Sequence, residues 1–186
     1  MCQAQTAAHA PLSSTVRRHS EAAMRPSRQR QLLGLAAWIL VSFAAASIGA
    51  IASIEAASFY GHLARPNWAP PSWLFAPVWS VLYVLMGFAA WLVWQSYGFK
   101  AGRTALVLFI SQLAANALWT WLFFAWRQGA AAFAEILILW VLIAATVVSF
   151  WRLNTLAGAL MLPYLAWVTF ACALTFSVWR LNVGLL

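Results

Sequence analysis

Polar and apolar residues alternate along this chain in long blocks. Residues 1–31 are polar and rich in Ala, Ser and Arg, and the rest of the chain consists of apolar runs joined by polar segments. The runs lie near residues 32–54, 73–97, 104–126, 131–151 and 155–179. Each has about the 20 residues that an α-helix needs to cross a bilayer, and an open strand would leave its backbone groups without partners in lipid. The pattern predicts an all-α integral membrane protein, a bundle of five transmembrane helices within residues 32–186.

The polar tail, residues 1–31, stands apart from that membrane domain. Its arginines, its serines and its single acid, Glu21, are typical of a transit peptide. An alternative interpretation begins the protein at Met24, which leaves a short basic leader before the first span. We expect the tail to be disordered or a leader, and we assign it no role in the function.

Composition and charge agree with a protein whose solvent is the lipid bilayer. Hydrophobic residues make up 65% of the chain and charged residues only 8%, which is more apolar surface than a soluble domain hides. The net charge of +8 would by itself suggest a nucleic-acid partner, but the basic residues flank the apolar runs as interfacial anchors do. We predict a multi-pass protein of a bacterial membrane, or of an organelle membrane in a eukaryote, with no nucleic-acid partner.

The spans lack the residues that several classes of membrane protein require. His9, His19 and His62 all lie outside them, so the helices cannot supply the axial histidines of a b-type cytochrome. No metal-binding motif, phosphate loop or catalytic Ser/His/Asp set is present. Glu135 is the only acid within a span and lies near its end, so we expect it to extend to the interface or to pair with Arg127. The remaining chemistry is an aromatic, nearly uncharged site with no metal and no covalently bound cofactor.

Tryptophan is unusually abundant, and its positions fall into two groups. One group lies near span ends, as interfacial anchors do: Trp73, Trp91, Trp94, Trp126, Trp151 and Trp179. The other group lies deeper: Trp79, Trp119, Trp121, Trp140 and Trp167. An interfacial belt does not explain the deep group, which leaves packing between helices or the wall of a ligand site as the alternatives.

Large rings recur at helical spacing in three of the spans. The stripes are Trp79, Tyr83, Met86, Ala90 and Trp94 in the second span, Gln112, Asn116, Trp119 and Phe123 in the third, and Tyr164, Trp167, Ala171 and Leu174 in the fifth. A single aromatic stripe usually serves helix packing, but three stripes with two amides among them favour a slot for an apolar ligand. We expect Gln112 to hydrogen-bond between helices and Asn116 to be a candidate for the polar edge of a ligand.

Four stretches, in this order and spacing, resemble the signature of the tryptophan-rich sensory protein and translocator protein family, also called the peripheral-type benzodiazepine receptor family. The stretches are NWAPPSWLFAPVWSVLYVLMG at 67–87, YGFK at 97–100, QLAANALWTWLFF at 112–124 and LPYLAWVTFACAL at 162–174. The resemblance covers about residues 32–182, all five spans. It implies a five-helix bundle, commonly a homodimer, that binds porphyrins such as protoporphyrin IX and other flat hydrophobic molecules between its helices.

The resemblance also implies which residues form the site. The ligand-binding residues would be Trp79, Tyr83, Asn116, Trp119, Tyr164, Trp167 and Ala171. A lid, the loop of residues 55–72 that follows the first span, would contribute Tyr60, Trp68 and Pro70. Animal relatives carry a sterol-recognition pattern with a tyrosine in the last helix, where this chain has Phe176, and that departure argues against sterol binding.

Three functions remain open at this point. The first is a membrane receptor or transporter for porphyrins, with no enzymatic activity. The second, implied by some bacterial relatives, is an enzyme that degrades porphyrins with light and oxygen, for which Trp79 and Trp167 are the candidate catalytic residues. The third is a structural membrane scaffold with no saturable ligand. Nothing in the sequence separates the first two.

Overall fold

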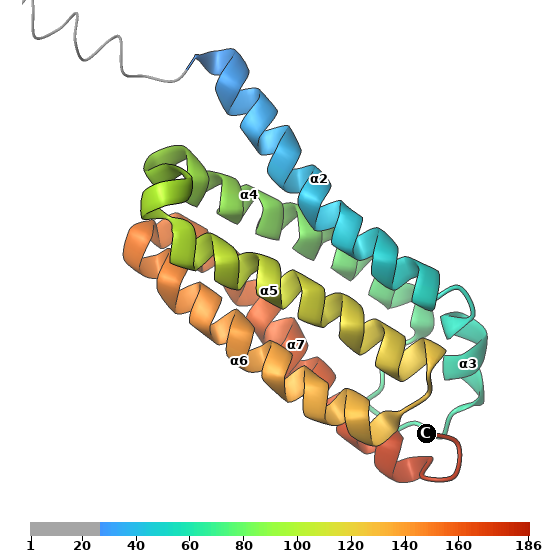
Figure 1. Cartoon of the computed structure of the whole chain (residues 1–186). Helices are drawn as coiled ribbons and strands as arrows, with labels where there is room; N and C mark the ends of the chain where they lie inside the picture. Colours follow the sequence, from blue (N-terminus) through green and yellow to red (C-terminus); the bar gives the residue numbers. More distant parts are fainter. Residues whose placement is uncertain (1–26) are drawn as a thin grey trace, which may run out of the picture.

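A computed structural model describes residues 27–186, and these residues form a bundle of long helices without a strand (Figure 1). The long helices are α2 (Arg28–Ala52), α4 (Phe75–Ala101), α5 (Arg103–Thr120), α6 (Gly129–Leu153) and α7 (Thr155–Leu181). A 3-10 turn (Ser72–Leu74) precedes α4, a π-helical turn (Trp121–Ala125) extends α5, and the short α3 (Ala56–His62) lies in the lid. Within residues 27–186, five segments are long and apolar enough to span a membrane, which confirms the predicted all-α transmembrane bundle.

Local hydrogen bonds set where the helices begin and end. The Ser27 hydroxyl accepts from the N–H of Arg30 at 3.3 Å, so α2 begins four residues before the predicted first span. Residues 1–26 of the predicted tail lie outside the described residues. At the same end of the bundle, opposite the lid, Asn154 Oδ1 accepts from the N–H of Ala157 at 3.1 Å and starts α7. Gly98 interrupts α4 with a positive φ of 62°, a conformation that glycine adopts without steric cost.

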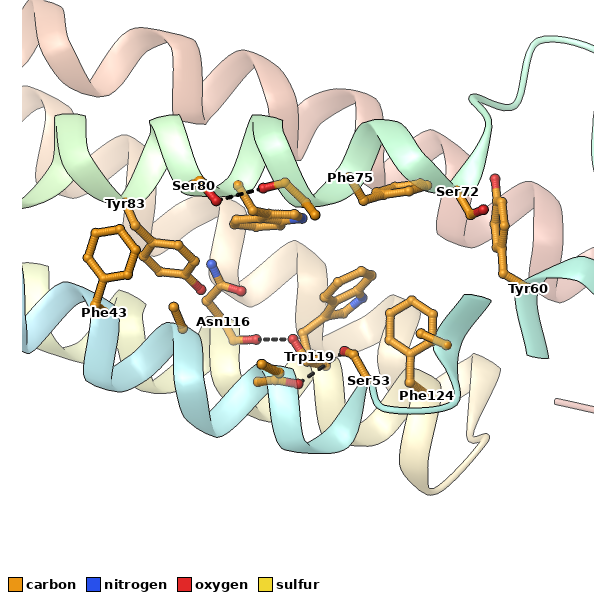
Figure 2. A pocket seen from close by; sticks show the side chains of 17 residues that line it. Phe43, Ser53, Tyr60, Ser72, Phe75, Ser80, Tyr83, Asn116, Trp119 and Phe124 are labelled. Atoms are coloured by element: carbon orange, nitrogen blue, oxygen red, sulfur yellow. Dashed lines mark hydrogen bonds between the residues drawn. The ribbon is translucent and has the colours of Figure 1, made fainter. Parts of the chain in front are cut away.

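Helix α2 crosses the bundle, and this crossing positions the site. In its first half it packs on α4, where a Cβ at Gly87 would lie 3.0 Å from the Cα of Ile39. In its second half it packs on α5, where a Cβ at Gly49 would lie 3.3 Å from Thr120 Oγ1. Because α2 leaves α4 for α5, the two helices separate toward the lid end, next to Trp79 and Tyr83 of α4 (Figure 2).

Several tryptophans hold the helices together through their indole N–H groups. Trp91 Nε1 donates to the Gln31 carbonyl at 3.0 Å, and Trp121 Nε1 donates to the Ile48 carbonyl at 3.2 Å. Trp140 Nε1 donates to Thr169 Oγ1 at 2.8 Å, between α6 and α7. Hydrogen bonds between helices, rather than a ligand site, therefore account for two of the deep tryptophans, Trp121 and Trp140.

Glu135 does not behave as the sequence suggested. Its side chain is only 7% exposed, and its Oε2 atom has no hydrogen-bond partner. Arg127 instead places its guanidinium carbon 4.8 Å from the centre of the Phe59 ring. The expectation that Glu135 extends to the interface or pairs with Arg127 is wrong, because the helical phase of α6 puts it on the buried stripe with Ala132 and Leu139.

The close approach at Gly87 gives a first prediction. Replacing Gly87 by Val forces a side chain against the backbone of α2, and we expect the free energy of unfolding to fall by about 1–3 kcal/mol. The matched control is Gly61→Ala in α3, where nothing lies within 4 Å of an added Cβ. We expect that control to be neutral or stabilising. Thermal unfolding of both variants in detergent measures the difference, and an unchanged Gly87→Val would contradict the close packing of α2 on α4.

Candidate functional site

A cavity of about 420 Å³ lies between α2, α4 and α5 at the lid end of the bundle (Figure 2). Helix α2 contributes Phe43, Ala46, Gly49, Ala50 and Ser53. Helix α4 contributes Phe75, Ala76, Trp79, Ser80 and Tyr83. The third wall is Asn116, Trp119, Thr120 and Phe124, and the lid closes the end with Ala56, Tyr60 and Ser72. None of these residues carries a formal charge, so the cavity suits an apolar molecule.

Aromatic side chains form opposite walls of the cavity. Trp79 and Tyr83 lie one helical turn apart on α4, and their ring centroids are 5.6 Å apart. Phe43 of α2 packs against Tyr83 at one end of the cavity, with the ring centroids 6.1 Å apart (Figure 2). Trp119 meets Phe124 edge to face at 6.0 Å, on the α5 side. Ring edges and faces at these separations pack favourably and leave flat surfaces toward the space between them.

Most hydroxyl groups in the walls have their protons engaged. Ser53, Ser80 and Thr120 each donate to a carbonyl four residues earlier in their own helix, at 3.0, 2.8 and 3.0 Å. Asn116 Nδ2 donates to the Tyr164 hydroxyl of α7 at 3.0 Å, on the side of Asn116 away from the cavity. Trp119 is different: it is 9% exposed, its Nε1 atom has no partner, and its ring points from α5 into the cavity (Figure 2). The ring of Trp119 therefore lines the cavity, while its Nε1 atom is a buried donor without a partner beside it.

A second, much smaller cavity of about 30 Å³ lies beside the first, toward α7. The two cavities share five residues: Tyr60, Phe75, Trp79, Trp119 and Phe124. Trp167 and Ala171 of α7 line only the smaller one. The indoles of Trp79 and Trp119 therefore lie between α7 and the main cavity. These two side chains would have to move for the two cavities to join.

The predicted residues divide into three groups by position. Trp79, Tyr83, Asn116, Trp119 and Tyr60 line the main cavity, whereas Trp167 and Ala171 line the smaller one. Tyr164, Trp68 and Pro70 line neither. Tyr164 is fully buried behind Trp79, with the ring centroids 6.1 Å apart. Trp68 is half exposed and meets the edge of Phe170 at 5.7 Å, and the Pro70 carbonyl accepts from the Tyr60 hydroxyl at 3.4 Å.

Sequence reasoning missed the wall contributed by α2. Phe43, Ala46, Ala50 and Ser53 recur at spacings of three or four residues, which is the helical period. The signal was present but weak, because three of these residues are small and such residues in a span usually indicate close helix contact. Gly49, another small residue of α2, serves both purposes: a Cβ added to it would lie 3.3 Å from Thr120 Oγ1 of α5, and it borders the cavity.

Tyr60 ties the lid to the mouth of the cavity. Burial raises the pKa of the Tyr60 phenol above its ordinary value of 10.0, and the Arg65 guanidinium, 4.8 Å from the ring centre, partly opposes that shift. The phenol is therefore protonated at neutral pH and can donate its hydrogen bond to the Pro70 carbonyl. This bond closes the segment between residues 60 and 70 into a loop.

The chain matches known proteins over nearly the whole of this bundle. The model of the TspO/MBR family matches residues 37–180. Protein CrtK of Rhodobacter capsulatus is 39% identical over 150 residues, which cover 80% of this chain and 92% of that protein. A tryptophan-rich sensory protein of Cereibacter sphaeroides is 41% identical over 149 residues, 78% of this chain and 92% of that protein. The translocator protein of Homo sapiens is 39% identical over 132 residues, 70% and 78% of the two chains.

The hydrogen bond between Asn116 and Tyr164 gives a second prediction. Tyr164→Phe removes the acceptor of Asn116 Nδ2 inside the bundle, where water does not replace it. We expect the free energy of unfolding to fall by about 0.6–2 kcal/mol, the range for hydrogen bonds between helices in a membrane. The control is Tyr97→Phe, whose exposed hydroxyl donates to the Leu153 carbonyl at 2.8 Å. We expect a change within about 0.5 kcal/mol there, and equal losses in the two variants would count against the buried bond.

Proposed function

Because the chain belongs to the TspO/MBR family, we propose that it is a membrane receptor or transporter that binds porphyrins, with protoporphyrin IX as the ligand. The proposed site is the cavity between α2, α4 and α5. One observation carries the proposal: this cavity has aromatic walls and no charged residue in its lining. Its volume of about 420 Å³ lies within the range of about 300–1,000 Å³ that is usual for small-molecule sites.

The direction in which the cavity opens also suits a hydrophobic ligand. Ala50 of α2 and Ala76 and Ser80 of α4 line the cavity and are exposed. These positions lie within spanning helices, so the gap between them faces the bilayer. A porphyrin dissolved in the membrane would reach the cavity between α2 and α4 without passing through water, once the lid residues Ala56, Tyr60 and Ser72 that close its end have moved aside. Arg65, beside the cavity-lining Tyr60, would remain at the lid end as a partner for the carboxylates of the ligand.

A substitution that fills the cavity tests the proposal directly. Ala46→Phe places a ring in the space that the porphyrin would occupy, and we expect the affinity for protoporphyrin IX to fall at least about tenfold, the effect of losing about 1.4 kcal/mol. The control is Ala44→Phe on the same helix, because Ala44 is exposed and does not line the cavity.

The measurement is quenching of intrinsic tryptophan fluorescence when the purified protein in detergent is titrated with protoporphyrin IX in the dark. Saturable quenching that weakens only in Ala46→Phe supports the cavity as the site. Quenching that never saturates means that the porphyrin partitions into micelles, and it would favour a scaffold. Equal weakening in both variants would place the site elsewhere.

A second candidate function, light- and oxygen-dependent porphyrin degradation, is favoured by one observation. The indoles of Trp79 and Trp119 both border the cavity, where a bound, photoexcited porphyrin would contact an electron-rich ring. We expect Trp79→Phe to slow light-driven loss of bound porphyrin by at least about threefold if the indole takes part, which corresponds to at least about 0.6 kcal/mol in the barrier. Trp140→Phe is the control, because Trp140 also lies within a span but hydrogen-bonds to Thr169 and does not line the cavity. Equal rates of loss in wild type and both variants would remove the enzymatic alternative.

A further inference from the structure

A single side chain fastens the lid to the end of the last helix. Asn182, which follows α7, is only 6% exposed. Its Oδ1 atom accepts from the N–H of Ala64 at 2.9 Å, and its Nδ2 atom donates to the carbonyl of Ala64 at 2.8 Å. The amide thus satisfies both backbone groups of one lid residue, as a neighbouring strand would. The two residues are 118 positions apart in the chain.

Ending the helix does not by itself explain these bonds. The backbone N–H of Asn182 donates to the Trp179 carbonyl at 3.1 Å, and its Nδ2 atom donates to the Val178 carbonyl at 2.7 Å. Those two bonds satisfy carbonyls of the last turn of α7. The Oδ1 atom contributes nothing to α7, because its partner is the lid. The amide group therefore has one bond to the helix and two to the lid.

The lid residue that Asn182 holds lies close to the cavity wall. Ala64 follows α3, the short helix that carries Tyr60. Tyr60 lines the cavity and meets the edge of Phe75, with ring centroids 5.5 Å apart. Fixing the peptide groups of Ala64 fixes the end of α3 and hence the position of Tyr60 at the mouth.

Other contacts between the lid and the rest of the bundle are of a different kind, and they include the side chain of Leu63, which is 5% exposed and belongs to the apolar core. Trp68 meets the edge of Phe170 at 5.7 Å, and the Arg127 guanidinium lies 4.8 Å from the centre of the Phe59 ring. Contacts with an aromatic ring tolerate sliding, whereas two hydrogen bonds to one residue fix both position and orientation. The amide pair is therefore the contact most sensitive to a small opening of the lid.

We propose that Asn182 is a positioning residue that holds the lid closed over the cavity and so sets how fast a ligand enters and leaves. This inference rests on the proposed function, because it takes the cavity as the ligand site. If the lid must open for exchange, the fraction of open lid multiplies the association rate and the dissociation rate equally. We call the two hydrogen bonds between Asn182 and Ala64 the latch. Weakening the latch then raises both rates and leaves the dissociation constant nearly unchanged. Loss of a contact in the cavity wall would instead change the dissociation constant.

The test is Asn182→Ala in the full chain, with Asn154→Ala as the matched control. Asn154 starts the same helix by accepting from Ala157, so its loss lowers helix stability without touching the lid. Association of protoporphyrin IX is followed in the dark by stopped-flow quenching, and dissociation is followed with excess serum albumin as a porphyrin trap. We expect both rates to rise about 5- to 30-fold in Asn182→Ala, as the loss of two ordinary hydrogen bonds predicts. The dissociation constant should stay within about threefold, and Asn154→Ala should change neither rate.

Two results would overturn the proposal. Unchanged rates in Asn182→Ala would mean that Asn182 serves only to end α7. A faster dissociation with an unchanged association rate would mean that Asn182 stabilises the bound ligand and does not control opening of the lid. If Asn182→Ala does not fold, Ala64→Pro removes the N–H from the lid side instead. Leu63, at φ −77° and ψ 141°, already has the extended conformation that a residue before proline requires, and both rates should again rise together.

Hydrogen–deuterium exchange of the ligand-free protein separates failure of this inference from failure of the proposed function. We expect the amides of residues 60–70 to exchange faster in Asn182→Ala than in wild type or Asn154→Ala. If wild type shows no saturable porphyrin binding but exchange is faster in Asn182→Ala, the porphyrin proposal fails and the latch stands. If exchange is unchanged in Asn182→Ala, the latch fails whatever the protein binds.

Discussion

The bilayer offers no hydrogen-bond partner, and most of the architecture follows from that constraint. Backbone groups must pair within their own segment, so the chain spans as helices. Side chains obey the same rule: the hydroxyls of Ser53, Ser80 and Thr120 return to their own backbone, and the indoles of Trp91 and Trp121 donate to carbonyls of α2. Once these groups are satisfied inside the protein, the surfaces that remain are apolar, and a cavity between such helices is apolar as well.

Against that background, the few buried side-chain atoms that have no hydrogen-bond partner among residues 27–186 are informative. Trp119 Nε1 is buried and has no partner, and its ring borders both cavities. Gln112 Oε1 and Glu135 Oε2 are buried without a partner too, but neither residue lines either cavity. An unpaired donor inside a membrane protein costs free energy that the rest of the fold must offset. Of these three residues only Trp119 lines a cavity, so only there does the unpaired group lie next to a space that a molecule could fill.

The sequence predicts the bundle better than it predicts the site, for physical reasons. Hydrophobic length alone identifies the spans, because the thickness of the bilayer fixes it. The cavity depends on how α2 crosses from α4 to α5, and that path follows from where Gly87 and Gly49 permit close approach. Several glycines and alanines in the spans look equivalent in the sequence, so the wall made by Ala46 and Ala50 carries no distinct signal. Aromatic stripes show that α7 faces the interior, but they do not show that Trp79 and Trp119 separate Trp167 from the main cavity.

The lid obeys different physics from the helices beneath it. Inside the bundle no water is at hand to replace a partner, so breaking a contact such as Asn116 with Tyr164 leaves both polar groups unpaired. Ala64 is exposed at the end of the bundle, outside the spanning segments, where water can replace Asn182 at its peptide groups. Because water can take the place of Asn182, the two hydrogen bonds contribute little net free energy, although their geometry is specific. A contact of that kind can open on the timescale of ligand exchange without unfolding the spans. The lid can therefore close over a ligand that comes from the membrane and can still open to release that ligand.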